Sequence, residues 1–142
     1  MYMHKVQYYE TDKMGVVHHS NYIRWFEEAR GAYMEDRNYP YENIENKGMC
    51  VPVLSVECEY KKSTRYGETV EIDVKLVDVG NVRHKFIYEV RECKTKELRA
   101  TGYTTHCLLD ENGRPVSIKR KEPELYKLLM ENIVEGGMEK SV

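Results

Sequence analysis

The chain has 142 residues, of which 32% are charged, and its formal net charge is −2. This length predicts one domain that can bury a core without disulfide or metal staples. The slight negative charge argues against a dedicated nucleic-acid binder, so any anion must be bound by a local cluster of Lys and Arg. No apolar run approaches the length of a membrane span, and residues 1–5 lack the apolar core of a signal peptide. We therefore expect a cytoplasmic protein.

The cysteines are scattered and form no C-x-x-C pair. In a cytoplasmic protein this pattern predicts reduced thiols that are mostly buried. Their spacing does not match a zinc site. Cys58 and Cys107 lie in strand-like stretches, where a small apolar side chain is the usual role, so a cysteine nucleophile is not expected either.

The first third of the chain predicts a strand, a turn and a long helix. Residues 6–11 are expected to form the strand. Ser20 and Asn21 then offer N-cap chemistry for a helix over residues 21–37. The apolar residues of this helix recur on one wide face, which predicts a helix largely wrapped by other structure. They are Tyr22, Phe26, Ala29 and Tyr33, flanked by Ile23, Trp25 and Ala32.

The rest of the chain predicts a sheet. A short helical turn over residues 41–47 is closed by Gly48, and strand-like segments follow at residues 51–62, 69–79, 85–92 and 98–110. Pro123 starts a last amphipathic helix, and the tail from Gly136 is expected to be frayed. The order of elements predicts an α+β fold. The long helix would pack on one face of a curled antiparallel sheet of about five strands.

The segment 8–22 carries most of the chemical information. Asp12 is expected at a strand end, opposite the helix N-terminus, where unpaired backbone N–H groups and a partial positive charge are available. Such donors can hold the oxygen of a thioester carbonyl while Asp12 attacks the carbonyl or activates water. This pattern predicts an enzyme, and acyl-CoA thioesterase is the leading class. Thioester hydrolysis needs no metal and no redox cofactor.

The order of elements, together with a signature in this segment, resembles the hotdog-fold thioesterases of the 4-hydroxybenzoyl-CoA thioesterase family. The signature consists of Thr11, Asp12, Gly15, Val16, Val17, His19 and Tyr22. It is most similar to the bacterial branch of short acyl-CoA thioesterases associated with the Tol-Pal envelope system. The resemblance covers nearly the whole chain and implies a single hotdog domain over residues 1–142. It also implies a homodimer, or a homotetramer of paired dimers, with active sites between subunits.

The resemblance further implies roles for individual residues. Asp12 would be the catalytic carboxylate, and the backbone N–H of His19 would polarise the thioester carbonyl. Tyr8 and the side chain of His19 would also lie in the site. Two departures from the family pattern, His18 in place of a common Tyr and Lys13-Met14 in place of a smaller pair, predict an altered acyl pocket. The expected pocket residues are Met14, Gly15, Val16, His18 and Tyr22.

Two basic clusters are candidates for binding the phosphates of CoA. Arg83 and Lys85 flank a predicted hairpin, and Lys119, Arg120 and Lys121 follow a proline. Lys and Arg supply the point charges and bidentate contacts that phosphates favour. The alternative is a solvated surface.

Each candidate residue also has a structural alternative. Asp12 suits a turn or an N-cap, and His19 suits the first turn of a helix. Tyr8 would lie roughly 13 Å from Asp12 along one strand, so it would serve the core or the site of a second subunit. His106 lies in a strand and is expected to be packed or on the surface.

For the whole protein, the alternative is a non-catalytic module that binds acyl-CoA or an acyl-carrier protein on the same fold. The sequence leaves several points open. They are the acyl group, the choice between CoA and carrier protein, the role of Asp12 as nucleophile or base, and the choice between dimer and tetramer.

Overall fold

The computed structural model of the chain describes residues 1–134. Its centre is one antiparallel sheet with the strand order β1-β3-β4-β5-β2, and the short β6 pairs with β5. This order places β1 and β2 at the two edges. The strands are β1 (Tyr2–Lys5), β2 (Val53–Tyr60), β3 (Thr69–Val79), β4 (Arg83–Glu92), β5 (Leu98–Leu109) and β6 (Pro115–Val116).

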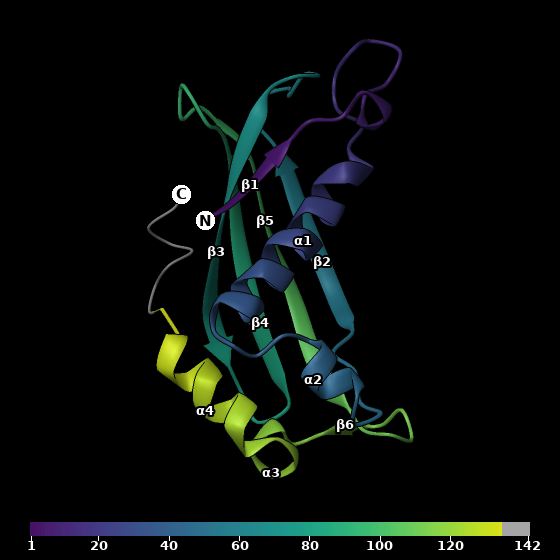
Figure 1. Cartoon of the computed structure of the whole chain (residues 1–142), viewed down its shortest axis with the longest axis vertical. Coiled ribbons are helices and arrows are strands. Elements are labelled where there is room, and N and C mark those ends of the chain that lie inside the picture. Colours follow the sequence, from purple (N-terminus) through teal and green to yellow (C-terminus); the bar gives the residue numbers. More distant parts are fainter. Residues whose placement is uncertain (135–142) are drawn as a thin grey trace.

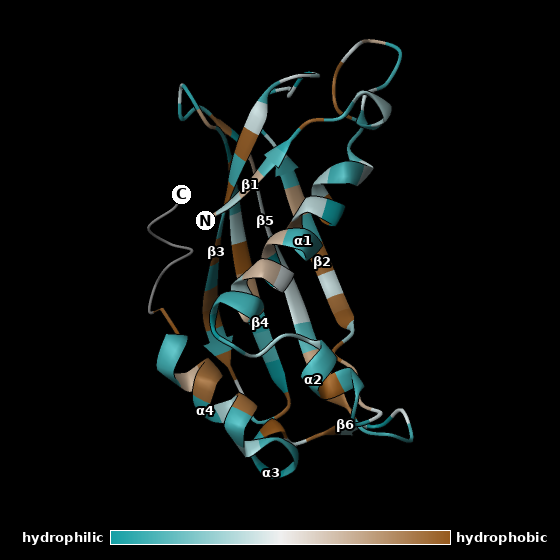
Figure 2. Cartoon of the chain, in the orientation of Figure 1, coloured by the Kyte–Doolittle hydropathy of each residue, from teal (hydrophilic) through white to brown (hydrophobic). Residues whose placement is uncertain are grey.

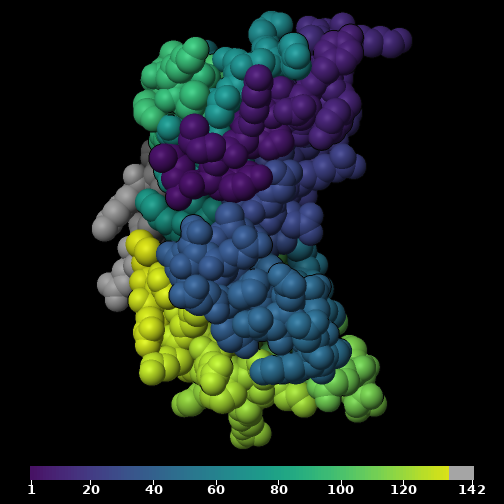
Figure 3. All heavy atoms as spheres, in the orientation of Figure 1, coloured from purple at the N-terminus to yellow at the C-terminus, as the bar shows by residue number. Residues whose placement is uncertain are grey.

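The sheet curls around one long helix, α1, which crosses its face (Figure 1). The helices are the 3-10 helix η1 (Tyr8–Glu10), α1 (Ser20–Asp36), α2 (Glu42–Glu45), α3 (Ile118–Lys121) and α4 (Pro123–Asn132). The N-terminal segment, α1 with the loop after it, and α4 form a layer in front of the sheet (Figure 3). The predicted α+β arrangement, a long helix wrapped by a curled antiparallel sheet, is confirmed.

Helix α1 is seated on the sheet by an aromatic side chain that packs against a glycine. Phe26 is fully buried and stacks on Tyr88, with the ring centroids 4.3 Å apart. A Cβ atom added to Gly102 would lie 2.6 Å from the Phe26 ring, closer than real side chains approach. The missing side chain at Gly102 therefore allows α1 to lie against β5.

The prediction of a strand over residues 6–11 is wrong. The first strand lies earlier, at Tyr2–Lys5, and the segment after it forms η1. The backbone N–H of Glu10 donates to the carbonyl of Gln7 at 3.0 Å, and that of Thr11 donates to the carbonyl of Tyr8 at 3.1 Å. The Glu10 carboxylate also folds back to accept the Gln7 N–H at 2.8 Å. Because these bonds are local, the segment closes on itself instead of pairing with a strand.

The other elements follow the sequence closely. The turn closed by Gly48, the strands after it and the helix that starts at Pro123 are confirmed, with small differences at their ends. The short β6 and α3 were not predicted. The tail from Gly136, predicted to be frayed, lies outside the described residues. Within residues 1–134, none of the helices is long and apolar enough to cross a membrane.

The edge strand β2 exposes apolar side chains. Val53, Leu54, Val56 and Tyr60 are each between 41% and 49% exposed. Figure 2 shows hydrophobic bands along this strand. Natural proteins usually cover or blunt such an edge, because its free N–H and C=O groups can pair with another strand.

We expect Gly102→Ala to lower the free energy of unfolding by about 1–3 kcal/mol, because the added methyl group clashes with the backbone carbonyl of Glu57 and overpacks the contact with Phe26. Gly31→Ala is the matched control. A Cβ at Gly31 meets nothing within 4 Å, and Ala is favoured over Gly inside a helix by roughly 0.5–1 kcal/mol. Urea unfolding followed by circular dichroism measures both variants. Equal stabilities of the two variants would show that α1 does not depend on the close approach at Gly102.

Candidate active site

The loop before α1 is a closed turn built on Asp12. The Asp12 N–H donates to the carbonyl of Val16 at 2.8 Å, and the Gly15 N–H donates to the carbonyl of Asp12 at 3.0 Å. Oδ1 of the carboxylate accepts the N–H of Met14 at 2.8 Å and of Val16 at 3.4 Å. Gly15 has a φ of +77°, which glycine adopts without strain. Across residues 1–134 no group donates a hydrogen bond to Oδ2, and Asp12 is exposed.

Backbone hydrogen bonds fix this turn beside the residues that lead into α1. Thr11 forms an antiparallel bridge with Val17. The N–H of Val17 donates to the carbonyl of Thr64, and that of His18 donates to the carbonyl of Glu10, both at 2.8 Å. The turn is thus held from one side by the loop between β2 and β3 and from the other by η1.

A buried carboxylate, Glu10, connects the turn to β1 and α1. It is 4% exposed. Its Oε2 accepts the indole N–H of Trp25 at 2.8 Å, and its Oε1 lies 2.8 Å from Nε2 of His4. Burial alone would raise the pKa of Glu10, but the hydrogen bonds from His4, the Gln7 N–H and Trp25 together lower it below its ordinary value. Sequence reasoning missed this residue, because a glutamate in a polar stretch carries no sign of burial.

The start of α1 leaves a backbone donor free. His19 occupies the N-cap position and its side chain does not cap the helix, so the prediction that Ser20 or Asn21 is the cap is wrong. Nδ1 of His18 instead accepts the N–H of Ser20 at 3.3 Å. The side-chain N–H of Asn21 instead donates to the carbonyl of Glu10 at 2.9 Å and ties the helix to the turn. The backbone N–H of His19 has no acceptor in the described part of the chain. An unpaired N–H at a helix start is suited to hold an oxyanion.

A groove of about 200 Å³ opens at this end of α1. Its wall is aromatic, because the rings of Tyr22 and Tyr60 meet edge to face with their centroids 5.2 Å apart. The Tyr60 hydroxyl donates to the carbonyl of His19 at 3.3 Å. The lining consists of Val17, His19, Tyr22 and residues 60–63.

The wall formed by residues 61–64 is held by an ion pair between a buried arginine and a half-buried glutamate. Arg99 is 7% exposed, and its two terminal nitrogens lie 2.9 and 3.0 Å from the two carboxylate oxygens of Glu68. The hydrogen bonds from Arg99 lower the pKa of Glu68. Arg99 also donates to the carbonyl of Ser63 at 2.9 Å. Strand β5 therefore fixes the loop that carries the groove.

Other predicted site residues lie around the turn. Tyr8 is in η1, 77% exposed and edge-on to Tyr66, so its predicted place on a strand with Asp12 is wrong. The rings of His18 and His19 lie 4.2 Å apart, and no group of three metal-ligating side chains gathers within residues 1–134. Of the predicted acyl-pocket residues, Tyr22 lines the groove in the described chain. Met14, Gly15, Val16 and His18 stand outside its lining.

The two basic clusters lie at the opposite end of the molecule from the Asp12 turn (Figure 1). Arg83 begins β4, and Lys119 and Arg120 are exposed in α3. Nζ of Lys85 lies 4.2 Å from the ring centre of Tyr103. Nζ of Lys121 pairs with Glu111 at 3.2 Å. Within one protomer the structure does not bring these residues to the turn.

A different set of cations adjoins the groove. Lys61 and Lys62 line it, and Nη1 of Arg65 lies 3.7 Å from where a Cβ on Gly15 would stand. Sequence reasoning missed these residues. The sequence feature that could have indicated these cations is the Lys-Lys pair directly after a predicted strand, close to the Tyr66-Gly67 turn.

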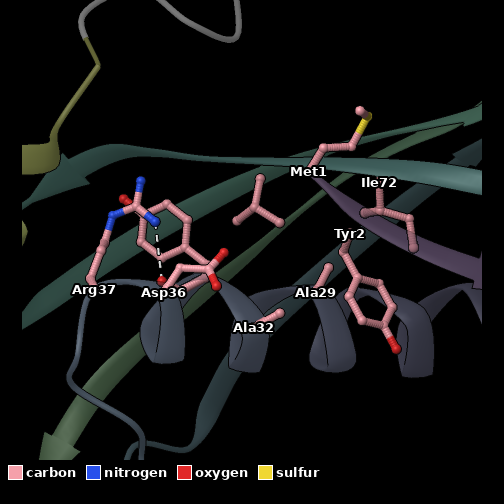
Figure 4. Close-up of a pocket in the computed structure, with 9 residues that line it drawn as sticks. Met1, Tyr2, Ala29, Ala32, Asp36, Arg37 and Ile72 are labelled. Carbon is pink, nitrogen blue, oxygen red and sulfur yellow. Dashed lines mark hydrogen bonds between the residues drawn. The ribbon is translucent and has the colours of Figure 1, made fainter.

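A smaller hollow of about 90 Å³ lies between β1 and α1 (Figure 4). The guanidinium of Arg37 lies 3.4 Å from the ring centre of Tyr33 and donates to the Tyr33 carbonyl at 3.1 Å. This hollow adjoins the C-terminal half of α1, whereas Asp12 precedes its N-terminus. It takes no part in the candidate site.

Comparison with known proteins identifies the family. Residues 6–131 match the model of the thioesterase-like superfamily. The chain belongs to this superfamily. It is 39% identical to a putative esterase of Aquifex aeolicus, over 89% of this chain and 97% of that protein. It is 31% identical to the putative acyl-CoA thioesterase YneP of Bacillus subtilis, over 86% of this chain and 88% of that protein.

A solved structure agrees with this assignment. The DHNA-CoA thioesterase from Staphylococcus aureus is similar with a TM-score of 0.88 and 31% identity, over 94% of this chain and 95% of that chain. The hotdog fold and the enzyme class predicted from the sequence, a thioester hydrolase, are confirmed.

We expect Glu10→Gln to lower the free energy of unfolding at neutral pH by about 1.5–3 kcal/mol, because hydrogen bonds to a charged group are lost. The pKa of Glu10 in the folded protein lies below the ordinary value of 4.5. Its stabilisation is therefore complete above pH 4.5 and is lost as the pH falls through the folded pKa. Urea unfolding at a series of pH values should show the difference between wild type and variant shrinking in acid.

The matched control is Glu28→Gln. Its carboxylate also contacts His4, at 3.3 Å, but is 42% exposed. We expect a smaller loss of stability from this change, since solvent screens exposed pairs. A Glu10→Gln deficit that does not change in acid would contradict the assignment of Glu10 as the charged anchor.

Proposed function

We propose that the protein hydrolyses acyl-CoA thioesters to a carboxylic acid and CoA. The observation that carries this proposal is the Asp12 turn, which holds one carboxylate oxygen and leaves the other free, beside a helix start with an unpaired backbone N–H. Two relatives, a putative acyl-CoA thioesterase and a DHNA-CoA thioesterase, support CoA as the thiol.

In the proposed reaction the His19 N–H donates to the thioester carbonyl oxygen and stabilises its developing negative charge. If Asp12 is the base, it takes a proton from water as the water oxygen bonds to the carbonyl carbon. The C–S bond then breaks, and the CoA thiolate takes up the proton. If Asp12 is the nucleophile, its oxygen displaces the CoA thiolate to form a mixed anhydride, which water hydrolyses.

The groove residues would assist these steps. The imidazole of His19 suits proton transfer near neutral pH. Tyr22 and Tyr60 would hold the acyl or pantetheine chain against their rings. Met14, Gly15, Val16 and His18 would shape the acyl pocket from the turn, and Tyr8 is exposed and available to a second subunit.

A homodimer through β2 is part of this proposal. The strand is an open edge with exposed apolar side chains, and pairing it with a second copy would satisfy its free backbone groups. Such a dimer would place the active sites between subunits, and paired dimers would form a tetramer.

We also propose that the chain belongs to the 4-hydroxybenzoyl-CoA thioesterase family within this superfamily, and to its Tol-Pal-associated branch. The proposal includes a cytoplasmic location and a single domain over residues 1–142.

We expect Asp12→Asn to lower kcat for acyl-CoA by at least about 10³-fold, with little change in binding, because a nucleophile or base is lost. The chain offers a close structural control in Asp110. Its Oδ1 accepts the N–H of Asn112 at 2.9 Å and of Arg114 at 3.0 Å, and Gly113 has a φ of +76°. Asp110→Asn therefore disturbs the same kind of turn and should leave kcat unchanged. A free-thiol assay with a panel of acyl-CoAs measures both variants.

Near-normal turnover by Asp12→Asn would rule out the proposed mechanism. An alternative is a non-catalytic module that binds acyl-CoA or an acyl-carrier protein. Tight binding of acyl-CoA by the wild-type protein, with no turnover of any substrate in the panel, would support that alternative.

We expect Val56→Glu to convert the homodimer into a monomer with little activity, because it places a charge at the centre of β2. Met130→Glu is the control, since Met130 is 43% exposed on α4 and Val56 is 41% exposed on β2. Sedimentation velocity at micromolar concentration gives the oligomeric state. A stable, active monomer of the wild-type protein would contradict the β2 interface.

We expect the basic cluster of α3 and the cations of the groove, Lys61 and Lys62, to differ in their effect on the KM for acyl-CoA. Neutralising a cation that contacts a CoA phosphate should raise the KM for acyl-CoA and leave that for a short thioester without the nucleotide unchanged. The effect should fall at high salt, because exposed charges are screened within about 8–10 Å. The pair Lys119→Gln/Arg120→Gln is compared with Lys61→Gln/Lys62→Gln. Equal effects of one pair on both substrates would show that this pair does not bind the nucleotide.

A further inference from the structure

A second hollow lies at the other end of β2 from the groove at His19. It has a volume of about 270 Å³ and lies between the middle of α1, helix α2 and the segment that leads into β2. Its lining includes the side chains of Arg30, Tyr41, Ile44, Val51 and Pro52. A cavity of about 150 Å³ already holds benzene, so this hollow has room for a small organic group.

Arg30 brings into this hollow a positive charge that forms no ion pair with a carboxylate of residues 1–134. The residue is 6% exposed, and its Nη1 donates to the hydroxyl of Tyr88 at 3.1 Å. Throughout residues 1–134 no carboxylate lies within ion-pair distance of its guanidinium. Arginine keeps its charge in proteins, and a buried charge without a partner is strongly unfavourable.

Burial alone would lower the pKa of Arg30, but the neighbouring Tyr88, Tyr41 and Glu27 raise it above its ordinary value, so the guanidinium stays charged. The buried hydroxyl of Tyr41 has no partner among the described residues. Burial, and then the charge of Arg30, lower the pKa of His84 to about 4 and that of His106 to about 3. Both imidazoles are therefore neutral at pH 7.

The two carboxylates that line the hollow belong to exposed residues. Glu27 and Glu45 face water as well as the hollow. Solvent and salt screen such charges, so they compensate Arg30 weakly. The buried end of the hollow therefore stays electropositive.

In one chain this hollow is too far from the Asp12 turn to share a small substrate. Ten residues of helix separate Ser20 from Arg30, which is about 15 Å at 1.5 Å per residue. The proposed β2 dimer changes this relation. If two antiparallel copies pair over the whole of Val53–Tyr60, residue 53 of one faces residue 60 of the other. Segment 50–52 then faces segment 61–63 of the partner subunit, which carries that subunit's groove.

We propose that the hollow at Arg30 binds the terminal carboxylate of the acyl group, so that the enzyme prefers ω-carboxyacyl thioesters of short chain. The inference rests on the proposed thioesterase function and dimer. A carboxylate would neutralise Arg30 and accept two parallel N–H bonds from its guanidinium. The Tyr41 hydroxyl would donate a further bond. Ile44, Val51 and Pro52 would contact the methylene groups between the carboxylate and the thioester.

A matched pair of substrates tests the proposal. Glutaryl-CoA and pentanoyl-CoA have acyl groups of five carbons, and only the first has a terminal carboxylate. We expect the wild-type kcat/KM to favour glutaryl-CoA by about 10- to 100-fold, the size expected for hydrogen bonds between charged groups. Arg30→Gln keeps a donor for Tyr88 and should remove this preference.

Tyr41→Phe provides a variant with little risk to folding, because its hydroxyl has no partner to lose within residues 1–134. It should lower the preference for glutaryl-CoA by about 3- to 10-fold, the effect of one hydrogen bond. Tyr33→Phe is its control, since Tyr33 also has a buried hydroxyl without a partner among the described residues but lines the smaller hollow. It should leave the preference unchanged.

A wild-type preference for pentanoyl-CoA, or equal rates for both substrates, would overturn the proposal. So would a higher kcat/KM for 4-hydroxybenzoyl-CoA than for glutaryl-CoA, since a neutral phenol would then fit the hollow better than a carboxylate.

Calorimetric binding of glutaryl-CoA and pentanoyl-CoA to the Asp12→Asn variant separates this proposal from the proposed function. Selective binding of glutaryl-CoA that is weakened by Tyr41→Phe and lost with Arg30→Gln, without turnover by the wild type, would support the carboxylate site and contradict the hydrolase mechanism. Unselective binding would contradict the carboxylate site.

Discussion

The arrangement of the Asp12 turn depends on the hydrogen bonds of one buried carboxylate, that of Glu10. It joins His4 of β1, the backbone of η1 and Trp25 of α1 at one point. The carbonyl of the same residue accepts bonds from the His18 N–H and the Asn21 side chain. Glu10 thus holds β1 and η1 against the first turns of α1. The Asp12 turn lies between η1 and α1, so its position depends on the buried charge of Glu10.

The turn itself is not what distinguishes Asp12. Asp110 organises a turn with the same pattern of bonds, including the glycine with positive φ. The difference lies in the surroundings. Asp12 adjoins the start of a long helix with an unpaired N–H, whereas Asp110 connects β5 to β6. Local sequence determines the shape of both turns. Tertiary structure places the free carboxylate oxygen of Asp12, but not that of Asp110, beside the start of a long helix.

Periodicity in the sequence predicts most of the fold correctly. The wide apolar face of α1 and the alternation in β3 and β5 are clear sequence signals, because most side chains on the inner face of each element are buried. The strand expected over residues 6–11 fails because local hydrogen bonds, one of them to the Glu10 carboxylate, close the segment into η1. The candidate site was predicted in part: the turn and the helix start follow from the signature around Asp12. The groove wall at Tyr60 and the burial of Arg30 could not be predicted, since both depend on which loops meet in space.

Trp25 is the single tryptophan of the chain, and its indole N–H is bonded to Glu10. It is fully buried, and its ring lies 4.9 Å from that of His4 and 4.8 Å from that of Tyr22. The protein thus carries its own fluorophore beside Glu10, the residue that anchors the Asp12 turn. A red shift of its emission reports water entering at that anchor, and the tyrosine and phenylalanine rings of the core do not obscure the signal. Local opening of the loop can therefore be followed in the unlabelled enzyme, separately from unfolding of the sheet.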